Sequence, residues 1–216
     1  MEAIITPDYV IDRVASLRPE DCERYGIRAI GFDVDGTLTE YLESMAETEQ
    51  STLTALGRAG LDLFVISNAF GKRAAELPKI FGDYMPTDHI ITPADCVDPD
   101  NPHDTPDIHS KPMPDMILHA FTMMPEGFRP DQFLMIGDQL FKDPVAGHLA
   151  GAQTALVAQL GIHDHPSVQL QRAAERSALQ QLGMPYTQDM YPTHLARLER
   201  RWQKYWGMVQ SVHCYV

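Results

Sequence analysis

The chain has 216 residues, of which 44% are hydrophobic and 22% are charged, a composition typical of folded globular proteins and not of disordered ones. Its formal net charge of −13 argues against a surface that binds nucleic acid or anionic lipid as a whole, because such partners select basic faces. No apolar run approaches the roughly 18 to 20 residues of a membrane-spanning helix, and the cysteines are too far apart to suggest a disulfide framework or a zinc site. We expect a cytoplasmic protein, whose length suffices for one well-buried α/β core.

Short apolar segments alternate with helical ones along the first 160 residues. Buried strands are expected at 29–34, 61–66, 133–136 and 153–157. Helices are expected at 47–59, 71–80, 114–123 and 144–150. This βαβα order favours an α/β fold with a parallel sheet, flanked by helices on both faces, whose strands all end on one side.

The segments around these elements give a provisional domain organisation. A core domain is expected over residues 1–160, with a helical lead-in at 1–28, followed by a C-terminal helical extension at 161–216. Seven prolines between Met85 and Pro114 predict an extended surface loop over 85–114, because proline breaks helices and strands alike. The loop is either a structural excursion or a lid that controls access of substrate.

Polar residues follow three of the predicted strands, at the carboxyl ends where open α/β sheets bind their ligands. A DxD pair on its own is weak evidence, because it also occurs at solvated strand ends. Here further polar residues accompany the pair: two groups follow other predicted strands, and a lysine precedes a predicted helix. In chain order the set is Asp33, Asp35, Ser67, Asn68, Lys111, Asp138 and Asp143.

In this order, each in a strand–loop–helix context, the set resembles the four motifs of the haloacid dehalogenase (HAD) superfamily. The resemblance implies a Rossmann-like HAD fold and phosphoryl-transfer chemistry. It implies that Asp33 attacks phosphorus to form a phospho-aspartyl intermediate, and that Asp35 protonates the leaving oxygen and later activates water. The dehalogenase branch lacks an acid at the position of Asp35, so phosphate ester hydrolysis is favoured.

The resemblance also implies a set of phosphoryl-binding groups. The Ser67 hydroxyl and the loop amides around Gly36, Thr37 and Asn68 are expected to bind phosphoryl oxygens. Lys111 is expected to offset the negative charge between nucleophile and phosphate, with a surface salt bridge as the alternative.

A metal ion is implied by the same motifs. Mg²⁺ prefers hard oxygen ligands in octahedral geometry and keeps several waters. The expected protein ligands are the Asp33 carboxylate, the Asp35 backbone carbonyl and Asp138, and Asp143 is expected to support the metal from nearby.

The spacing of the motifs leaves no room for a large inserted cap domain, since 34 positions separate Asp33 from Ser67 and 44 separate Ser67 from Lys111. We therefore expect an open active site. A closer likeness, to the YqeG-type subfamily IIIA phosphatases, is carried by residues 7–10, 17–20, 25–30 and 137–141. That family includes enzymes that dephosphorylate phosphatidylglycerophosphate, which makes a lipid phosphate a candidate substrate. Gly36, the proline-rich stretch and the residues beyond Gly161 depart from the family pattern.

The C-terminal extension carries two further patterns. From His194 onward, aromatic and aliphatic residues at helical spacing are interleaved with arginine and lysine, which predicts an amphipathic helix. This helix could dock on the core, bind a second subunit in a homo-oligomer, or make a peripheral contact with a membrane. The run 163–165 (His-Asp-His) lacks a third partner at a recognisable spacing, so a polar loop is favoured over a zinc site.

Taken together, these patterns predict a Mg²⁺-dependent phosphatase that acts on a phosphorylated small molecule or lipid and not on nucleic acid. The alternative substrates are sugar phosphates and nucleotides. A different class of function, a catalytically silent member that binds a phosphorylated ligand, also fits an open site. The intact Asp33, Asp35, Lys111 and Asp138 argue against it.

Overall fold

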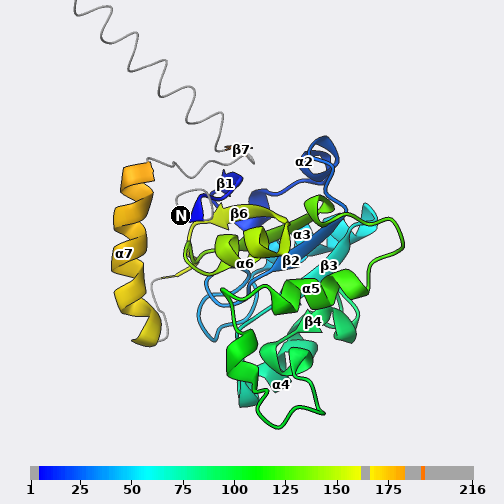
Figure 1. Cartoon of the computed structure of the whole chain (residues 1–216). Coiled ribbons are helices and arrows are strands. Elements are labelled where there is room, and N and C mark those ends of the chain that lie inside the picture. The colour runs from blue at the N-terminus through cyan, green and yellow to red at the C-terminus, as the bar shows by residue number, and fades with distance from the viewer. Residues whose placement is uncertain (1–4, 162–165, 183–190, 193–216) are drawn as a thin grey trace, which may run out of the picture.

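A seven-stranded sheet with the strand order β4-β3-β2-β5-β6-β1-β7 forms the centre of the fold (Figure 1). The structure is a computed structural model that describes residues 5–161, 166–182 and 191–192. The strands are β1 (Tyr9–Ile11), β2 (Ala29–Phe32), β3 (Asp62–Ile66), β4 (Ile90–Ile91), β5 (Phe133–Gly137), β6 (Gln153–Val157) and β7 (Tyr191–Pro192). All neighbouring strands are parallel except β1 and β7.

Six α-helices and five short 3-10 helices surround the sheet in the described ranges. The α-helices are α2 (Pro19–Arg24), α3 (Glu47–Arg58), α4 (Gly71–Phe81), α5 (Asp115–Thr122), α6 (Asp143–Ala150) and α7 (Pro166–Leu182). The 3-10 helices are η1 (Val14–Ser16), η2 (Thr87–His89), η3 (Pro93–Cys96), η4 (Pro106–His109) and η5 (Pro130–Gln132). The parallel sheet, the helices and the α/β Rossmann-like architecture predicted from the sequence are confirmed.

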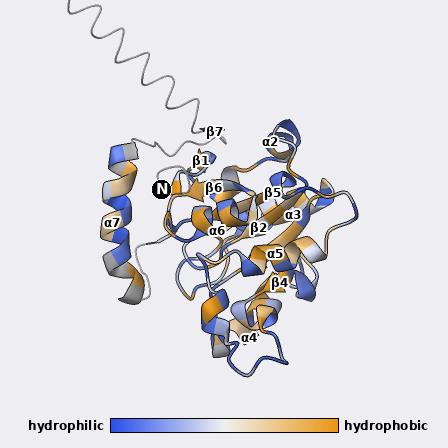
Figure 2. Cartoon of the chain, viewed as in Figure 1, coloured by the Kyte–Doolittle hydropathy of each residue, from blue (hydrophilic) through white to orange (hydrophobic). Residues whose placement is uncertain are grey.

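Alternation along the strands divides the core into two layers. Ile30 and Phe32 of β2 point to one face, where they join a cluster that includes Leu53 of α3. Ala29 points to the other face, in a cluster that includes Met116 of α5. Successive side chains of a strand point to opposite faces, so both faces of this buried sheet need apolar residues. Figure 2 shows apolar strands in the centre and helices of mixed polar and apolar colour around them.

Helix α7 covers the end of the sheet where β6 and β1 lie. Its half-buried Ala178 and Leu179 pack against the buried Val10, Leu140 and Leu156. In Figure 1 it is the long helix beside the edge of the domain. No helix among the described residues is both long and apolar enough to cross a membrane. The amphipathic helix expected from His194 onward and the run 163–165 lie outside the described residues.

The lead-in at 1–28 is not helical throughout, because Tyr9–Ile11 forms strand β1 and pairs with β6. The three residues of β1 are all buried, yet a strand of this length is too short to show a period in the sequence. Its partner lies more than 140 positions along the chain, in the register Tyr9 with Ala155. Tertiary pairing therefore decides this strand.

The proline-rich segment 85–114 has more local order than an extended loop. It contains strand β4, which pairs with β3, and the 3-10 helices η2, η3 and η4. Pro93 and Pro106 each occupy the first turn of a 3-10 helix, where the fixed φ of proline suits the helix and its missing N–H costs nothing. The prolines therefore begin short helices here.

Candidate active site

The carboxyl ends of β2 and β5 meet at a topological switch point. From β2 the chain continues to β3 on one side, whereas from β5 it continues to β6 on the other. Ligands of open α/β sheets bind in the crevice that such a reversal leaves. Asp33 follows β2, where its N–H donates to the carbonyl of Ile136 over 2.8 Å, and Asp138 follows β5.

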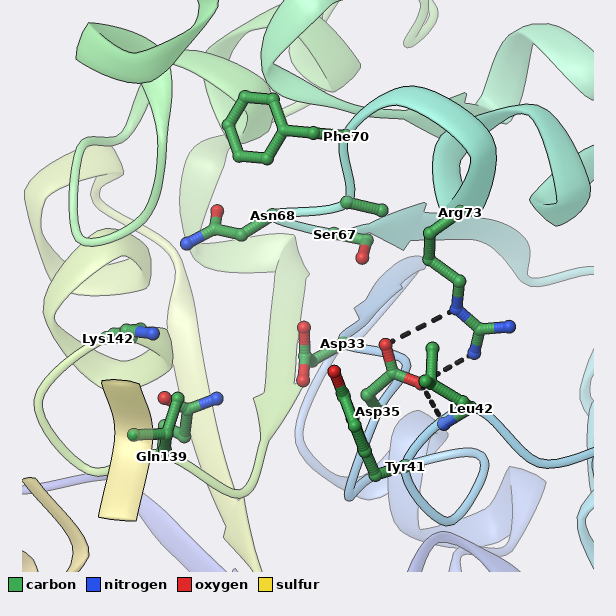
Figure 3. A pocket seen from close by; sticks show the side chains of 12 residues that line it. Asp33, Asp35, Tyr41, Leu42, Ser67, Asn68, Phe70, Arg73, Gln139 and Lys142 are labelled. Atoms are coloured by element: carbon green, nitrogen blue, oxygen red, sulfur yellow. Dashed lines mark hydrogen bonds and ion pairs between the residues drawn. The ribbon is translucent and has the colours of Figure 1, made fainter. Parts of the chain in front are cut away.

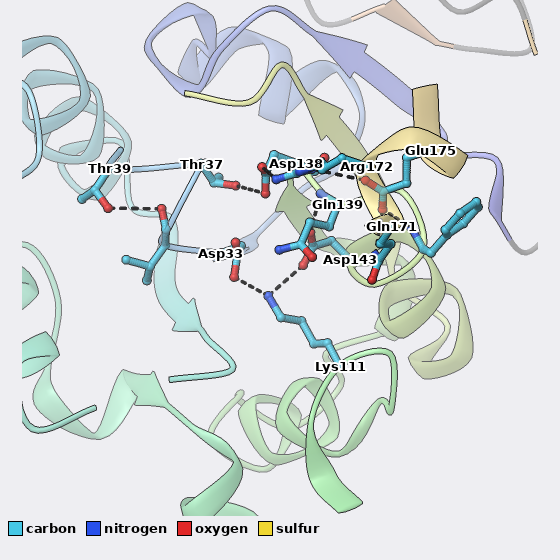
Figure 4. A network of polar contacts seen from close by, with 12 residues as sticks. Asp33, Thr37, Thr39, Lys111, Asp138, Gln139, Asp143, Gln171, Arg172 and Glu175 are labelled. Atoms are coloured by element: carbon cyan, nitrogen blue, oxygen red, sulfur yellow. Dashed lines mark hydrogen bonds and ion pairs between the residues drawn. The ribbon is translucent and has the colours of Figure 1, made fainter. Parts of the chain in front are cut away.

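Lys111 is buried at the centre of the site, with 4% of its surface exposed. Its Nζ donates to Asp33 Oδ1 over 2.5 Å and to Asp143 Oδ1 over 2.7 Å (Figure 4). Burial alone would lower the pKa of Lys111, but the charges of Asp143 and Asp33 outweigh it and raise that pKa above its usual value. Lys111 therefore stays charged beside Asp33, and the surface salt bridge considered from the sequence is not what the structure contains.

Asn68 holds Lys111 in place through the backbone. Asn68 Nδ2 donates to the Lys111 carbonyl over 3.1 Å, and the Lys111 N–H donates to Asn68 Oδ1 over 2.8 Å. The two bonds join the loop after β3 to the loop before α5, 43 positions apart. The Asn68 side chain is thus committed to Lys111, while Ser67 beside it is buried and lines the same pocket as Asp33.

Three carboxylates form a compact cluster that could hold a metal ion. One oxygen from each of Asp33, Asp138 and Asp143 lies within 4.8 Å of the others, and all three residues are buried. Burial raises the pKa of Asp33 to about 6 although Lys111 opposes the shift, and Asp143 adds to it. Burial likewise raises the pKa of Asp138 to about 8, against the opposing charge of Arg172. The three carboxylates outnumber the two cations that contact them, Lys111 and Arg172.

The donor set suits a small divalent cation. Carboxylate oxygens are the ligands that Mg²⁺ prefers, and a bound cation would stabilise the charged forms that burial, and to a lesser extent mutual repulsion, disfavour. A further oxygen is available nearby, because Gln139 Oε1 is a buried side-chain atom without a hydrogen-bond partner. The predicted ligands Asp33 and Asp138 and the supporting Asp143 are thus together, whereas a role for the Asp35 carbonyl stays a prediction.

Two glycines make this close approach possible. Gly36 has a φ of 91°, and a Cβ at this position would collide with the carboxylate of Asp138. A Cβ on Gly137 would collide with the carboxylate of Asp143. Only a residue without a side chain fits at either point.

Asp35 lies outside the buried cluster and is paired with an arginine that the sequence analysis did not identify. Arg73 Nη2 donates to Asp35 Oδ1 over 2.5 Å, and the N–H of Leu42 donates to the same oxygen over 3.1 Å (Figure 3). Arg73 is on the first turn of α4, and its sequence position carries no signal beyond following the Ser67-Asn68 motif.

An open pocket of about 480 Å³ lies above Asp33 and Asp35. Its apolar lining includes Leu42 and Phe70, which are 56% and 45% exposed. In Figure 3, Phe70 and Tyr41 stand on opposite sides of Asp33, and Arg73 and Lys142 also flank the opening. The pocket thus combines an acidic floor with a rim of apolar and cationic side chains.

Two predicted phosphoryl-binding amides are engaged within the loop that follows β2. The N–H of Gly36 donates to the Thr39 carbonyl over 2.7 Å, and the N–H of Thr37 donates to the Val34 carbonyl over 3.1 Å. Neither residue lines the pocket, whereas Ser67 and Asn68 do. Phosphoryl binding by Gly36 or Thr37 would require these bonds to open.

Residues 108–183, roughly a third of the chain, match the family model described as HAD-hydrolase-like. In this stretch the chain is similar to HAD-like hydrolases. The match includes Lys111, Asp138 and Asp143, whereas Asp33, Asp35 and Ser67 precede it. The match supports the resemblance to the superfamily and a hydrolase of phosphatase type. It does not test the likeness to the YqeG-type subfamily, which stays a prediction.

Solved structures add two weak similarities. An uncharacterized protein from Listeria monocytogenes serotype 4b is 17% identical, with a TM-score of 0.41 over 65% of this chain and 85% of that one. The hypothetical protein XCC2798 from Xanthomonas campestris is 19% identical, with a TM-score of 0.41 over 70% of this chain and 72% of that one. Similarity at this level carries no argument about function. The comparison with curated proteins gave no match.

Proposed function

We propose that this protein is a Mg²⁺-dependent phosphomonoester hydrolase in which Asp33 is the nucleophile. The observation that carries the proposal is the buried cluster of Asp33, Asp138 and Asp143 at the switch point, with Lys111 bonded to the nucleophile. Phosphoryl transfer depends on positioning and on neutralisation of oxygen charge, and this cluster provides groups for both. When bound there, Mg²⁺ would polarise a phosphoryl oxygen and offset its charge.

In the first step, a carboxylate oxygen of Asp33 attacks phosphorus and the ester P–O bond breaks, which leaves a phospho-aspartyl group and an alkoxide. Asp35 gives its proton to that alkoxide. In the second step, Asp35 takes a proton from water, whose oxygen attacks phosphorus, so that Asp33 and inorganic phosphate are released. Lys111 keeps Asp33 oriented and compensates negative charge in both steps.

The pair of Asp35 and Arg73 must open during this cycle. Arg73 contacts both carboxylate oxygens of Asp35, so neither oxygen is available to the leaving group or to water while the pair is closed. A phosphate ester that enters the pocket brings negative charge that can replace Asp35 as the partner of Arg73. Arg73 would then contact substrate while Asp35 is free to act as the acid.

A lipid phosphate such as phosphatidylglycerophosphate is the substrate class we propose first. The open pocket and the exposed Leu42 and Phe70 favour a large apolar leaving group. Peripheral membrane contact through the C-terminal residues belongs to the same proposal. A sugar phosphate or nucleotide is the second candidate, favoured by the cations Arg73 and Lys142 beside the opening.

The test is Mg²⁺-dependent phosphate release from phosphatidylglycerophosphate, sugar phosphates, nucleotides and an aryl phosphate. Asp33→Asn should reduce turnover by about 10⁴-fold or more, because charge and nucleophilicity vanish with little change of volume. The matched control is Asp83→Asn, at an exposed carboxylate that follows the C-terminal end of α4 and does not line the pocket, which should retain full activity. Turnover by Asp33→Asn would overturn the mechanism. No release by the folded wild-type protein would favour the silent ligand-binding alternative.

A further inference from the structure

Helix α7 brings a second buried cation to the carboxylate cluster. Arg172, which is 6% exposed, forms an ion pair with the carboxylate of Asp138 through Nη2. Its Nη1 donates to the backbone carbonyl of Asp138 over 2.9 Å and to Glu175 Oε2 over 3.3 Å. Figure 4 shows Arg172 and Glu175 on the side of Asp138 away from Thr37. One residue of α7 thus holds both the side chain and the main chain of a proposed metal ligand.

Glu175 fastens the same helix to the loop that carries the metal ligands. Its Oε1 accepts hydrogen bonds from the N–H of Phe141 over 3.1 Å and from Gln171 Nε2 over 2.9 Å. Glu175 itself is 3% exposed, so these contacts are partly shielded from water. Val168, one turn before Arg172, lines the pocket above Asp33. Helix α7 therefore forms part of the wall of the site and inserts a charge into its base.

Each carboxylate oxygen of Asp138 already has a partner in this arrangement. Oδ2 is paired with Arg172, and Oδ1 accepts a long hydrogen bond of 3.4 Å from the Thr37 hydroxyl. A divalent cation needs a lone pair of Asp138, and two cations on one carboxylate repel each other strongly where little water screens them. The guanidinium supplies positive charge where a divalent cation would otherwise supply it.

From this geometry we propose that Arg172 competes with the divalent cation for Asp138, and that α7 is a latch which loosens when the metal binds. The proposal rests on the metal site of the proposed function. The opposite role for Arg172 is to orient Asp138 for the metal. The two roles differ in sign, because loss of a competitor tightens metal binding, whereas loss of an orienting residue weakens it.

The first experiment is calorimetric titration of Mg²⁺ into the wild-type protein and into Arg172→Gln, Arg176→Gln and Asp138→Asn. Arg176 is an exposed arginine one turn further along α7, so its variant is the matched control. Arg172→Gln should lower the Kd for Mg²⁺ by about tenfold or more, which corresponds to about 1.4 kcal/mol. Arg176→Gln should leave the Kd unchanged, and Asp138→Asn should abolish binding.

An unchanged or higher Kd for Arg172→Gln, with binding intact in the wild type, overturns the competition. Absence of binding to the wild type overturns the metal site itself.

A second measurement uses the wild-type protein alone, in case Arg172→Gln fails to fold. Hydrogen exchange of the backbone amides of α7 is followed with and without saturating Mg²⁺. Competition predicts faster exchange in α7 with Mg²⁺, since the metal replaces the contact that fastens the helix, while exchange in β2 and β5 stays slow. Equal or slower exchange in α7 on Mg²⁺ binding overturns the latch.

Discussion

The two carboxylates that follow β2 have contrasting surroundings. Asp33 is buried, bonded to Lys111 and crowded by two further carboxylates, whereas Asp35 lies in the open pocket with Arg73 and the N–H of Leu42. The buried half of the site can fix the geometry of a reaction, because its partners cannot be exchanged for water. The outer half can exchange partners with an incoming substrate. The proposed division between chemistry and substrate binding follows from this difference in exposure.

The largest effect on the buried half is expected from Lys111→Met. The substitution leaves Asp33 and Asp143 without their shared cation, and breaking a buried pair costs about 3 kcal/mol of stability or more. Chemical denaturation should show this loss, and phosphate release should fall to background. Saturating Mg²⁺ should recover part of the stability, because it restores positive charge.

Lys79→Met is the control for this prediction, since Lys79 is an exposed lysine on α4. It should leave stability and activity unchanged. A Lys111→Met protein as stable as the wild type would show that the buried half does not depend on its cation.

A smaller effect on the buried half is expected from Asn68→Ala, which removes both bonds to the Lys111 backbone. Stability should fall by about 1 to 2 kcal/mol, and kcat by about 10- to 100-fold, because Lys111 is less well positioned. Asn68→Asp keeps the acceptor for the Lys111 N–H, so its stability and kcat should lie between those of the wild type and those of Asn68→Ala. If Asn68→Ala changes KM and leaves kcat intact, Asn68 contacts substrate instead of positioning Lys111.

The outer half is tested by Phe70→Ser, which removes an exposed aromatic ring from the pocket rim. For a lipid phosphate, kcat/KM should fall by about 5- to 10-fold through the loss of apolar contact, whereas a small soluble phosphate should be unaffected. Leu118→Ser is the control, since Leu118 is also 45% exposed but lies on α5. Equal losses for both substrates would remove the argument that the rim selects an apolar leaving group.

The smallest expected effect is on thermal stability and concerns the proline-rich segment, where His109 links Asp104 to Asp115 at the start of α5. The imidazole bridges Asp115 over 2.9 Å and Asp104 over 2.8 Å. The hydrogen bond to Asp115 raises the pKa of His109 against the opposing effect of burial, and the bond to Asp104 adds to the rise. A raised His pKa gives stability that is complete below the unfolded value and is lost as the pH rises through the folded value.

His109→Gln should therefore lower the thermal midpoint slightly at about pH 5.5 and less at about pH 9, as measured by thermal unfolding at both values. At acidic pH the partner Asp104 matters. The N–H of Asp98 is the main cause that lowers the pKa of Asp104, so the contribution of the Asp104 carboxylate to stability is lost as the pH falls through that lowered pKa. A deficit of His109→Gln that grows with pH would contradict a charged His109 in the bridge.

The sequence alone was informative wherever a property is local. Short apolar runs predicted β2, β3, β5 and β6 close to their observed bounds, because burial of both faces of a parallel sheet demands such runs. The strand pattern predicted that polar residues meet at the carboxyl ends of the sheet, and the resemblance to the HAD motifs added Lys111; the structure brings Asp33, Lys111, Asp138 and Asp143 together there.

The tertiary structure alone decided the contacts between distant segments that carry no local signal. Strand β1 exists because β6 offers an edge to pair with, and the order of the proline-rich segment depends on β3 and on His109. The partners Arg73 for Asp35 and Arg172 for Asp138 join residues 38 and 34 positions apart. An arginine on a helix has the same sequence pattern whether it faces water or a buried carboxylate, and only the packing of the helix determines which of the two it meets.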